Sequence, residues 1–174
     1  TNVLINYDNS IYLCLIVERR MKVTVLQRDI HWADPAANVA ASDVAIDRNP
    51  DSDLYILPEM FSTGFCTCPE GIAEASGSMT LDWMKSKASA TGAAIAGSVA
   101  VYEEGKYYNR FYFVKPDGSV TAYDKKHLFT FGGEHMHFTP GSERVTVEWK
   151  GVRILLEICY DLRFPVWSRN RGDY

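Results

Sequence analysis

The chain has 174 residues, a formal net charge of -4 and 47% hydrophobic residues, a composition that fits one globular domain with a full core. Because it carries no basic stripe, nucleic-acid binding is disfavoured. The four cysteines have irregular spacing, which favours a reducing compartment over a disulfide framework. We therefore expect a cytoplasmic protein.

The first residues form an atypical leader. Their apolar stretch at 11–17 is shorter than the roughly 20 residues that a membrane span needs, and the basic residues follow it, whereas those of a signal peptide precede the apolar run. Met21 looks like a natural start, because the β-branched stretch at 22–30 indicates a core strand directly after it. We expect a leader over residues 1–20 and a domain over residues 21–174.

The next elements alternate between helix and strand. Asp34 and Pro35 are typical of a helix start and belong to a helix predicted over residues 33–49. The continuous apolar run at 53–59 indicates a strand that is buried on both faces. A second helix is predicted over residues 78–92, where a glycine ends it.

The second half of the chain is richer in strands. Two of them, over residues 93–105 and 106–120, are predicted to pair as a hairpin, and a third strand follows over 120–129. Residues 144–160 contain two more strands joined near Lys150–Gly151, and a helix is predicted from Phe164 onward. This order predicts an α/β chain with a mixed sheet.

Three stretches each place a reactive side chain where a predicted strand ends and a loop begins. The residues are Glu59 in LPEMFSTGF, Lys125 in YDKKHLF and Cys159 in ICYDLRFP. In α/β sheets, ligands bind in the crevice beyond the strand ends. The three side chains can therefore meet in one pocket.

Together these side chains form a coherent chemical set. A cysteine thiol of ordinary pKa is largely protonated at neutral pH, and a carboxylate such as Glu59 can take its proton as general base. The ammonium of Lys125 can hold the oxyanion that forms when the thiolate of Cys159 attacks a carbonyl. The backbone N–H of Tyr160 is the natural second donor. The set describes a hydrolase that works without histidine.

The three segments resemble, in order and approximate spacing, the signature segments of the nitrilase superfamily, the carbon–nitrogen hydrolases. The resemblance runs over nearly all of residues 21–174. It implies that Glu59 is the general base, that Lys125 is the catalytic lysine and that Cys159 is the nucleophile. Lys126 does not match the position of the catalytic lysine.

The resemblance also implies a supporting glutamate. Many members of the superfamily have a second glutamate after the lysine segment. Glu134, which precedes Gly141 in EHMHFTPG, stands in that place. We assign it the orientation of the lysine and the substrate.

The combined segment YDKKHLFTFGGEHMHFTPG is most similar to the bacterial omega-amidase branch, whose members hydrolyse the terminal amide of 2-oxo acids such as 2-oxoglutaramate. The resemblance implies an α-β-β-α sandwich and a two-step reaction through a thioester at Cys159. It also implies that no cofactor or metal is needed and that the protein is a homodimer. Its partners would be a small-molecule amide and water, with no nucleic acid and no membrane.

A further implication concerns the extent of the domain. The family continues with more strands and helices after the segment that ends here at Tyr174. These would cover the sheet beside Cys159 and form one wall of the pocket. We therefore expect the domain over residues 21–174 to be incomplete at its C-terminus, and this chain by itself to be poorly soluble and inactive.

Other interpretations stay open. Another branch of the superfamily, such as the N-carbamoyl amino acid hydrolases, shares the same three residues. His127 could be the base of a papain-like cysteine hydrolase, but a structural role is favoured because a glutamate already supplies a base. His135 and His137 could bind a metal with Cys66 and Cys68, although typical zinc ligand pairs are more widely spaced. A non-catalytic binding or assembly module is the alternative of another class.

The neighbours of the candidate residues carry smaller expectations. Lys126 is expected at the surface. Asp161 and Arg163 are interpreted as an ion pair that fixes the loop after the nucleophile. Trp83 and Met84 lie in the second predicted helix and are expected in the core.

Overall fold

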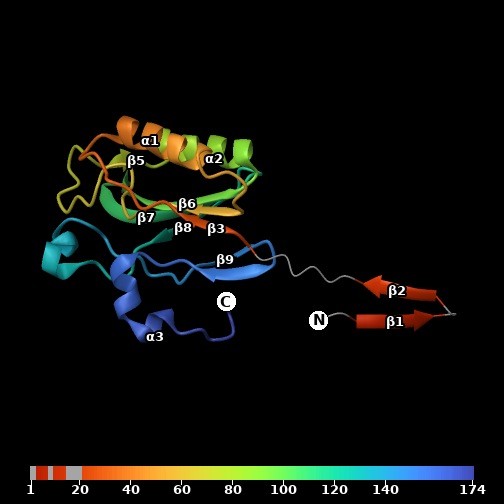
Figure 1. The fold of residues 1–174 in the computed structure, drawn as a ribbon. Coiled ribbons are helices and arrows are strands. Elements are labelled where there is room, and N and C mark those ends of the chain that lie inside the picture. Colours follow the sequence, from red (N-terminus) through yellow and green to blue (C-terminus); the bar gives the residue numbers. More distant parts are fainter. Residues whose placement is uncertain (1–2, 8–9, 15–20) are drawn as a thin grey trace.

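A mixed central sheet organises the chain in the computed structural model, which describes residues 3–7, 10–14 and 21–174 (Figure 1). The strand order is β3-β4-β6-β7-β8, with β5 paired to β6. The strands β3, β4, β5 and β6 run parallel, and β7 and β8 are antiparallel to their neighbours, so the expected mixed sheet is confirmed. The strands are β3 (Val23–Val25), β4 (Leu54–Ile56), β5 (Glu74–Ala75), β6 (Ala94–Glu103), β7 (Lys106–Val114) and β8 (Val120–Asp124).

The expected leader lies partly outside the described residues. Within it, β1 (Val3–Tyr7) and β2 (Ser10–Cys14) pair as an antiparallel hairpin. This hairpin is a sheet of its own and shares no strand pairing with the central sheet.

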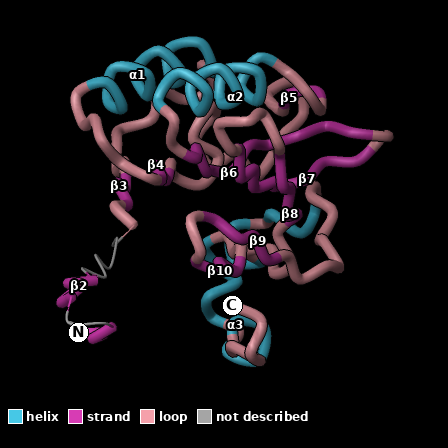
Figure 2. Tube along the Cα trace, turned by 90° about the vertical axis from the view of Figure 1, so that its right-hand side faces the viewer, coloured by secondary structure: helices cyan, strands magenta, loops and turns pink. Residues whose placement is uncertain are grey.

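Two helices cover one face of the central sheet (Figures 1 and 2). In α1 (Pro35–Asp47), the carboxylate of Asp34 accepts a hydrogen bond from the N–H of Ala37 at 3.0 Å, which confirms the predicted helix start. The second helix, α2 (Met79–Thr91), ends at Gly92 with φ +67°, as expected for a glycine that closes a helix.

The core between these helices and the sheet is apolar. Met84 of α2 is fully buried in this core. Trp83 is partly buried and packs against the same cluster, so both residues lie in the core as expected. Ile46 of α1 meets Tyr55 of β4 and Ile95 of β6 in this core. Burial on the helix side fixes the central sheet in place.

The opposite face of the sheet carries a third layer. The strands β9 (Thr146–Trp149) and β10 (Val152–Leu155) form an antiparallel hairpin whose turn contains Lys150 and Gly151, as predicted. The hairpin is a sheet of its own and does not join the central sheet. Instead Val147 and Ile158 pack against Phe113 in a second apolar cluster. The result is a layered mixed α/β fold of the α-β-β type (Figure 2).

The helix predicted from Phe164 onward is short. It begins at Pro165 but ends at Ser168, as helix α3 (Pro165–Ser168). The carbonyl oxygens of Trp167 and Arg169, at the end of this helix, accept hydrogen bonds from the guanidinium of Arg144 at 2.9 and 3.0 Å and not from a further helical turn. Among the described residues, no helix has the length and apolar character that crossing a membrane requires.

Candidate active site

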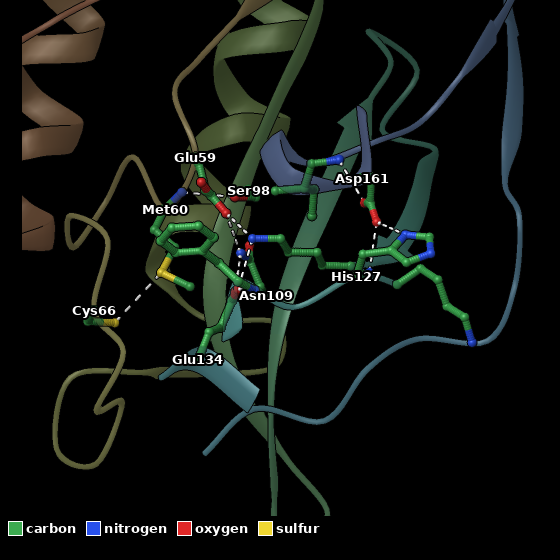
Figure 3. Close-up of polar contacts among 12 residues, drawn as sticks. Glu59, Met60, Cys66, Ser98, Asn109, His127, Glu134 and Asp161 are labelled. Carbon is green, nitrogen blue, oxygen red and sulfur yellow. Dashed lines mark hydrogen bonds and ion pairs between the residues drawn. The ribbon is translucent and has the colours of Figure 1, made fainter. Parts of the chain in front are cut away.

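Glu59 stands in a turn that follows β4 and runs beside the interior of β6, to which Leu57 and Phe61 donate backbone hydrogen bonds. Its neighbour Met60 is fully buried and has φ +47°, an uncommon conformation for a residue with a side chain. The N–H of Met60 donates a hydrogen bond to the hydroxyl oxygen of Ser98 in β6 at 2.8 Å (Figure 3). This bond compensates the strain and fixes the position from which the Glu59 carboxylate projects.

Lys125 follows β8 directly, as the sequence predicts, and its side chain is fully buried. Its ammonium donates hydrogen bonds to Glu59 at 2.7 Å and to Glu134 at 2.9 Å. Burial by itself lowers the pKa of this ammonium, but the charges of the two carboxylates and the hydrogen bonds to them outweigh burial and raise it. Lys125 is therefore held as a cation between two carboxylates.

Glu134 begins the short 3-10 helix η2 (Glu134–Met136) and is fully buried. One carboxylate oxygen accepts from Lys125, and the same oxygen accepts from the N–H of Phe129 at 2.6 Å. The other oxygen accepts from the side-chain amide of Asn109 at 3.0 Å. Glu134 thus holds the lysine through contacts with three segments of the chain.

Asn109 is a part of the site that sequence reasoning missed. It lies in β7, is 1% exposed, and its amide nitrogen donates to both Glu59 and Glu134, at 2.8 and 3.0 Å (Figure 3). A signal was present, because an asparagine interrupts the aromatic run KYYNRFYFV. A polar side chain in a buried strand needs partners. Asn109 finds them in the two carboxylates.

The sequence suggested that Cys159 lies where a strand ends. In the structure it lies beyond the strand. β10 ends at Leu155, and Cys159 begins the 3-10 helix η3 (Cys159–Arg163) with φ +45°. Left-handed backbone is costly for a residue with a side chain and is often found at functional sites. Because β9 and β10 form a separate layer, the cysteine reaches the end of the central sheet from outside it.

The thiol of Cys159 is exposed and faces Glu59. Burial of part of the residue raises the pKa of the thiol, the negative charge of Glu59 and a hydrogen bond to it raise it further, and the charge of Lys125 acts in the opposite direction. The net effect is a protonated thiol beside a carboxylate. This is the arrangement that a general base requires.

Asp161 has other partners than the expected Arg163. Its buried carboxylate accepts hydrogen bonds from the Tyr123 hydroxyl at 2.7 Å and from the backbone N–H of His127 at 2.8 Å. It also lies 2.8 Å from Nδ1 of His127 and accepts from the N–H of Ile158 at 3.1 Å (Figure 3). These bonds tie the segment around Lys125 to the turn that holds Cys159, and they engage the ring of His127 with Asp161. The expected ion pair between Asp161 and Arg163 is not among the contacts of the described residues.

One pocket of about 610 Å³ opens over this cluster. It is lined by Glu59, Phe65, Phe129, Phe131, Cys159, Tyr160 and Arg163. Within the part of the chain that the structure describes, Arg163 has no carboxylate partner. Lys126, expected at the surface, is partly buried and lies 5.9 Å from the Trp167 ring centre. The pocket combines a thiol, a carboxylate and a guanidinium with aromatic walls.

Of the histidines and cysteines of the metal interpretation, Cys68 and His137 lie side by side, with the sulfur 3.8 Å from Nε2, but they do not form a metal-binding group with the others. Among the residues described by the structure, no three of His, Cys, Asp and Glu form a group that could hold a metal ion. Cys66 is buried, with its sulfur 3.8 Å from that of Met60. Cys66, Cys68 and Cys159 are free thiols.

Gly141 packs directly against the backbone that precedes Lys125. A Cβ at this position would overlap the backbone carbonyl oxygen of Asp124. The backbone there cannot shift easily, because the carbonyl of Lys125 accepts from the N–H of Gly141 at 2.9 Å. We expect Gly141→Ala to lower the free energy of unfolding by about 3 kcal/mol, as overpacking does. Denaturant titration measures this.

The matched control for this prediction is Ser142→Ala. Ser142 is exposed and adjacent in sequence, so its replacement should change the free energy of unfolding by less than about 0.5 kcal/mol. Equal stability of the Gly141→Ala variant and the parent would show that the close approach to Asp124 is not a constraint.

Comparison with known proteins places this chain in a family. The carbon-nitrogen hydrolase family matches residues 22–171, and the chain belongs to that family. The expected superfamily and its layered α/β fold are thereby confirmed.

Two of the similar proteins are amidases by name. The chain is 46% identical to the omega-amidase YafV of Escherichia coli strain K12 over 158 residues, which is 88% of this chain and 60% of the relative. It is 34% identical to a 2-oxoglutaramate amidase of Bacillus subtilis, over 84% of this chain and 58% of that protein. The chain therefore spans about 60% of the length of the first of these relatives.

A solved structure gives the same picture. The chain superposes on XC1258 of Xanthomonas campestris, described as a CN-hydrolase superfamily protein with an arsenic adduct in its active site, with a TM-score of 0.84. The identity is 43%, and the match covers 87% of this chain and 57% of that one.

Proposed function

We propose that this chain carries the catalytic centre of a cysteine amidohydrolase in which Cys159 is the nucleophile, Glu59 the general base and Lys125 an oxyanion donor. The observation that carries the proposal is the contact set of Lys125. A buried ammonium is held between Glu59 and Glu134, beside a thiol that opens into a pocket. The family membership of the chain supports the same assignment.

In the first step, the Cys159 sulfur attacks the carbonyl carbon of the amide while Glu59 takes the thiol proton. The tetrahedral oxyanion is stabilised by Lys125 and by the backbone N–H of Tyr160. Glu59 then returns the proton to the leaving nitrogen, the carbon–nitrogen bond breaks, and ammonia departs. A thioester on Cys159 remains.

In the second step, Glu59 takes a proton from water, whose oxygen attacks the thioester carbon. The carbon–sulfur bond breaks, the proton passes to the sulfur, and the carboxylic acid leaves. Glu134 and Asn109 support both steps because their contacts hold the lysine and the general base in one geometry. No cofactor or metal takes part in this scheme.

The substrate that we propose is the terminal amide of a small 2-oxo acid, as the activities of the relatives suggest. Such a molecule carries a carboxylate at the end away from the amide. Arg163 lines the pocket with Cys159 and has no carboxylate partner among the described residues. A guanidinium binds carboxylates in a planar, bidentate manner. We therefore assign Arg163 to the carboxylate of the substrate.

The test of this assignment is Arg163→Gln, assayed for ammonia release with 2-oxoglutaramate and with a neutral amide of similar length. We expect kcat/KM for 2-oxoglutaramate to fall about 10–100-fold, the scale of a lost charged hydrogen bond. The neutral amide should change less than about 3-fold, because it has no carboxylate to lose. Arg169→Gln, at an exposed arginine outside the pocket, is the control.

Equal losses with the two amides would contradict carboxylate recognition by Arg163 while leaving the cysteine chemistry in place. An N-carbamoyl amino acid hydrolase is the second candidate, because its substrates also carry a carboxylate. Ammonia release from 2-oxoglutaramate, 2-oxosuccinamate, glutamine, carbamoyl amino acids and nitriles, measured side by side, separates the two. A homodimer and a cytoplasmic location complete the proposal, and elution volume and cell fractionation test them.

A further inference from the structure

A second thiol lies outside the pocket, next to a histidine. Cys68 is exposed, and its sulfur is 3.8 Å from Nε2 of His137. On the other side of the same ring, Nδ1 of His137 is 2.9 Å from a carboxylate oxygen of Glu70. None of these three residues lines the pocket of Cys159.

The three side chains are arranged in the order that activates a nucleophile. A thiol needs a base within hydrogen-bonding reach, and the base needs a third group that fixes its orientation and tautomer. When Glu70 accepts the proton on Nδ1, the lone pair of Nε2 faces the sulfur of Cys68. The contact spans a long distance in the chain, because Cys68 and His137 are 69 residues apart. The tertiary fold therefore brings the thiol and the imidazole together.

The neighbouring thiol provides a contrast within the same loop. Cys66 is fully buried, and burial raises the pKa of its thiol. Its sulfur lies 3.9 Å from the Thr63 hydroxyl oxygen and 3.8 Å from the Met60 sulfur, inside a buried apolar cluster. Figure 3 shows the contact with Met60. Two cysteines that are close in sequence thus have opposite surroundings, one closed and the other open beside a base.

We propose that Cys68 is a second reactive thiol of this protein, a modification site that His137 and Glu70 activate for attack on a hydroperoxide. The sulfur attacks the terminal peroxide oxygen as its proton passes to Nε2 of His137. A sulfur–oxygen bond forms, the oxygen–oxygen bond breaks, and the leaving oxygen takes the proton. The sulfur is oxidised to a sulfenic acid and the peroxide is reduced, to water when it is hydrogen peroxide.

The experiment follows oxidation of the 174-residue chain by hydrogen peroxide. Dimedone traps the sulfenic acid, and fragment-ion mass spectrometry separates Cys66 from Cys68. Cys159→Ala is present in every sample, so that the other exposed thiol does not consume peroxide. We expect labelling of Cys68 at least about 10-fold faster than labelling of Cys66, and at least about 10-fold slower labelling of Cys68 in His137→Gln, because its base is lost.

The matched control is His135→Gln, because His135 belongs to the same segment and has no contact with Cys68 among the described residues. It should label at the parent rate. Glu70→Gln gives an independent second variant at an exposed position, and we expect a rate between those of the parent and His137→Gln. Circular dichroism confirms that each variant is folded.

Two outcomes would overturn the proposal. One is an unchanged rate at Cys68 in both His137→Gln and Glu70→Gln. The other is a parent rate at Cys68 no higher than that of glutathione under the same conditions, since the surroundings would then add nothing to an ordinary free thiol. Neither outcome depends on the amidase activity, because Cys159 is absent throughout.

Discussion

Cys159→Ala is expected to abolish ammonia release, with a loss on the order of 10⁴-fold or more, because Cys159 is the thiol that lines the pocket among the described residues and forms the proposed thioester. Stability should change little. The residue is exposed, and the backbone turn that holds it depends on Asp161, which the substitution leaves intact. The measurements are ammonia release, the denaturation midpoint and intact-protein mass after incubation with substrate. The parent should gain the mass of the acyl group, and the variant should not.

Cys68→Ala is the control for this prediction, because it removes an exposed thiol outside the pocket. It should keep full turnover and the acyl adduct. An active Cys159→Ala variant, or an adduct that persists in it, would refute the role of Cys159. Parent and variants are compared in chains of the same length, in a form whose parent releases ammonia at a measurable rate.

Lys125→Ala is expected to cost both activity and stability. The loss of an oxyanion donor lowers kcat by about 10²-fold or more. The loss of the ammonium also leaves Glu59 and Glu134 without their shared cation, and Glu134 is fully buried. Removing one partner of a buried ion pair costs about 3–5 kcal/mol in the free energy of unfolding. The burial of Lys125 is therefore the reason why the substitution affects stability as well as chemistry.

Lys126→Ala is the matched control. Its ammonium lies 5.9 Å from the Trp167 ring centre and has no carboxylate partner among the described residues, so the substitution should be nearly silent. Glu59→Gln completes the series, with an expected loss of about 10²-fold for a missing general base. Ammonia release and urea denaturation are the two measurements. An essential Lys126 beside a dispensable Lys125 would contradict the assignment of the lysine.

Local signals were enough to predict several elements. Asp34 and Pro35 start a helix and Gly92 ends one through hydrogen-bonding and backbone preferences of the residues themselves. The turn at Lys150–Gly151 joins two strands for the same kind of reason. Boundaries were less predictable. The strand expected over residues 22–30 is only Val23–Val25, because strand length depends on what a neighbouring strand offers for pairing.

The candidate site was predictable as a set of residues but not as a geometry. Glu59, Lys125 and Cys159 could be named because each lies in a short segment with a family resemblance. The contact between Glu59 and Lys125 joins residues 66 positions apart. The asparagine in the aromatic run indicates that Asn109 needs polar partners, but not that these are Glu59 and Glu134. In the same way, no short stretch indicates that Asp161 pairs with His127 and not with Arg163.

The sequence by itself determined the α/β class, the start of α1, the end of α2 and the identity of the candidate residues, because these depend on side-chain chemistry and short-range patterns. Only the tertiary structure decided that β9 and β10 form a separate layer and that Lys125 is buried between two carboxylates. It also brought Cys68 to His137. The physical reason is that long-range contacts follow from how whole layers pack against one another, and such packing has no signal in a short stretch of sequence.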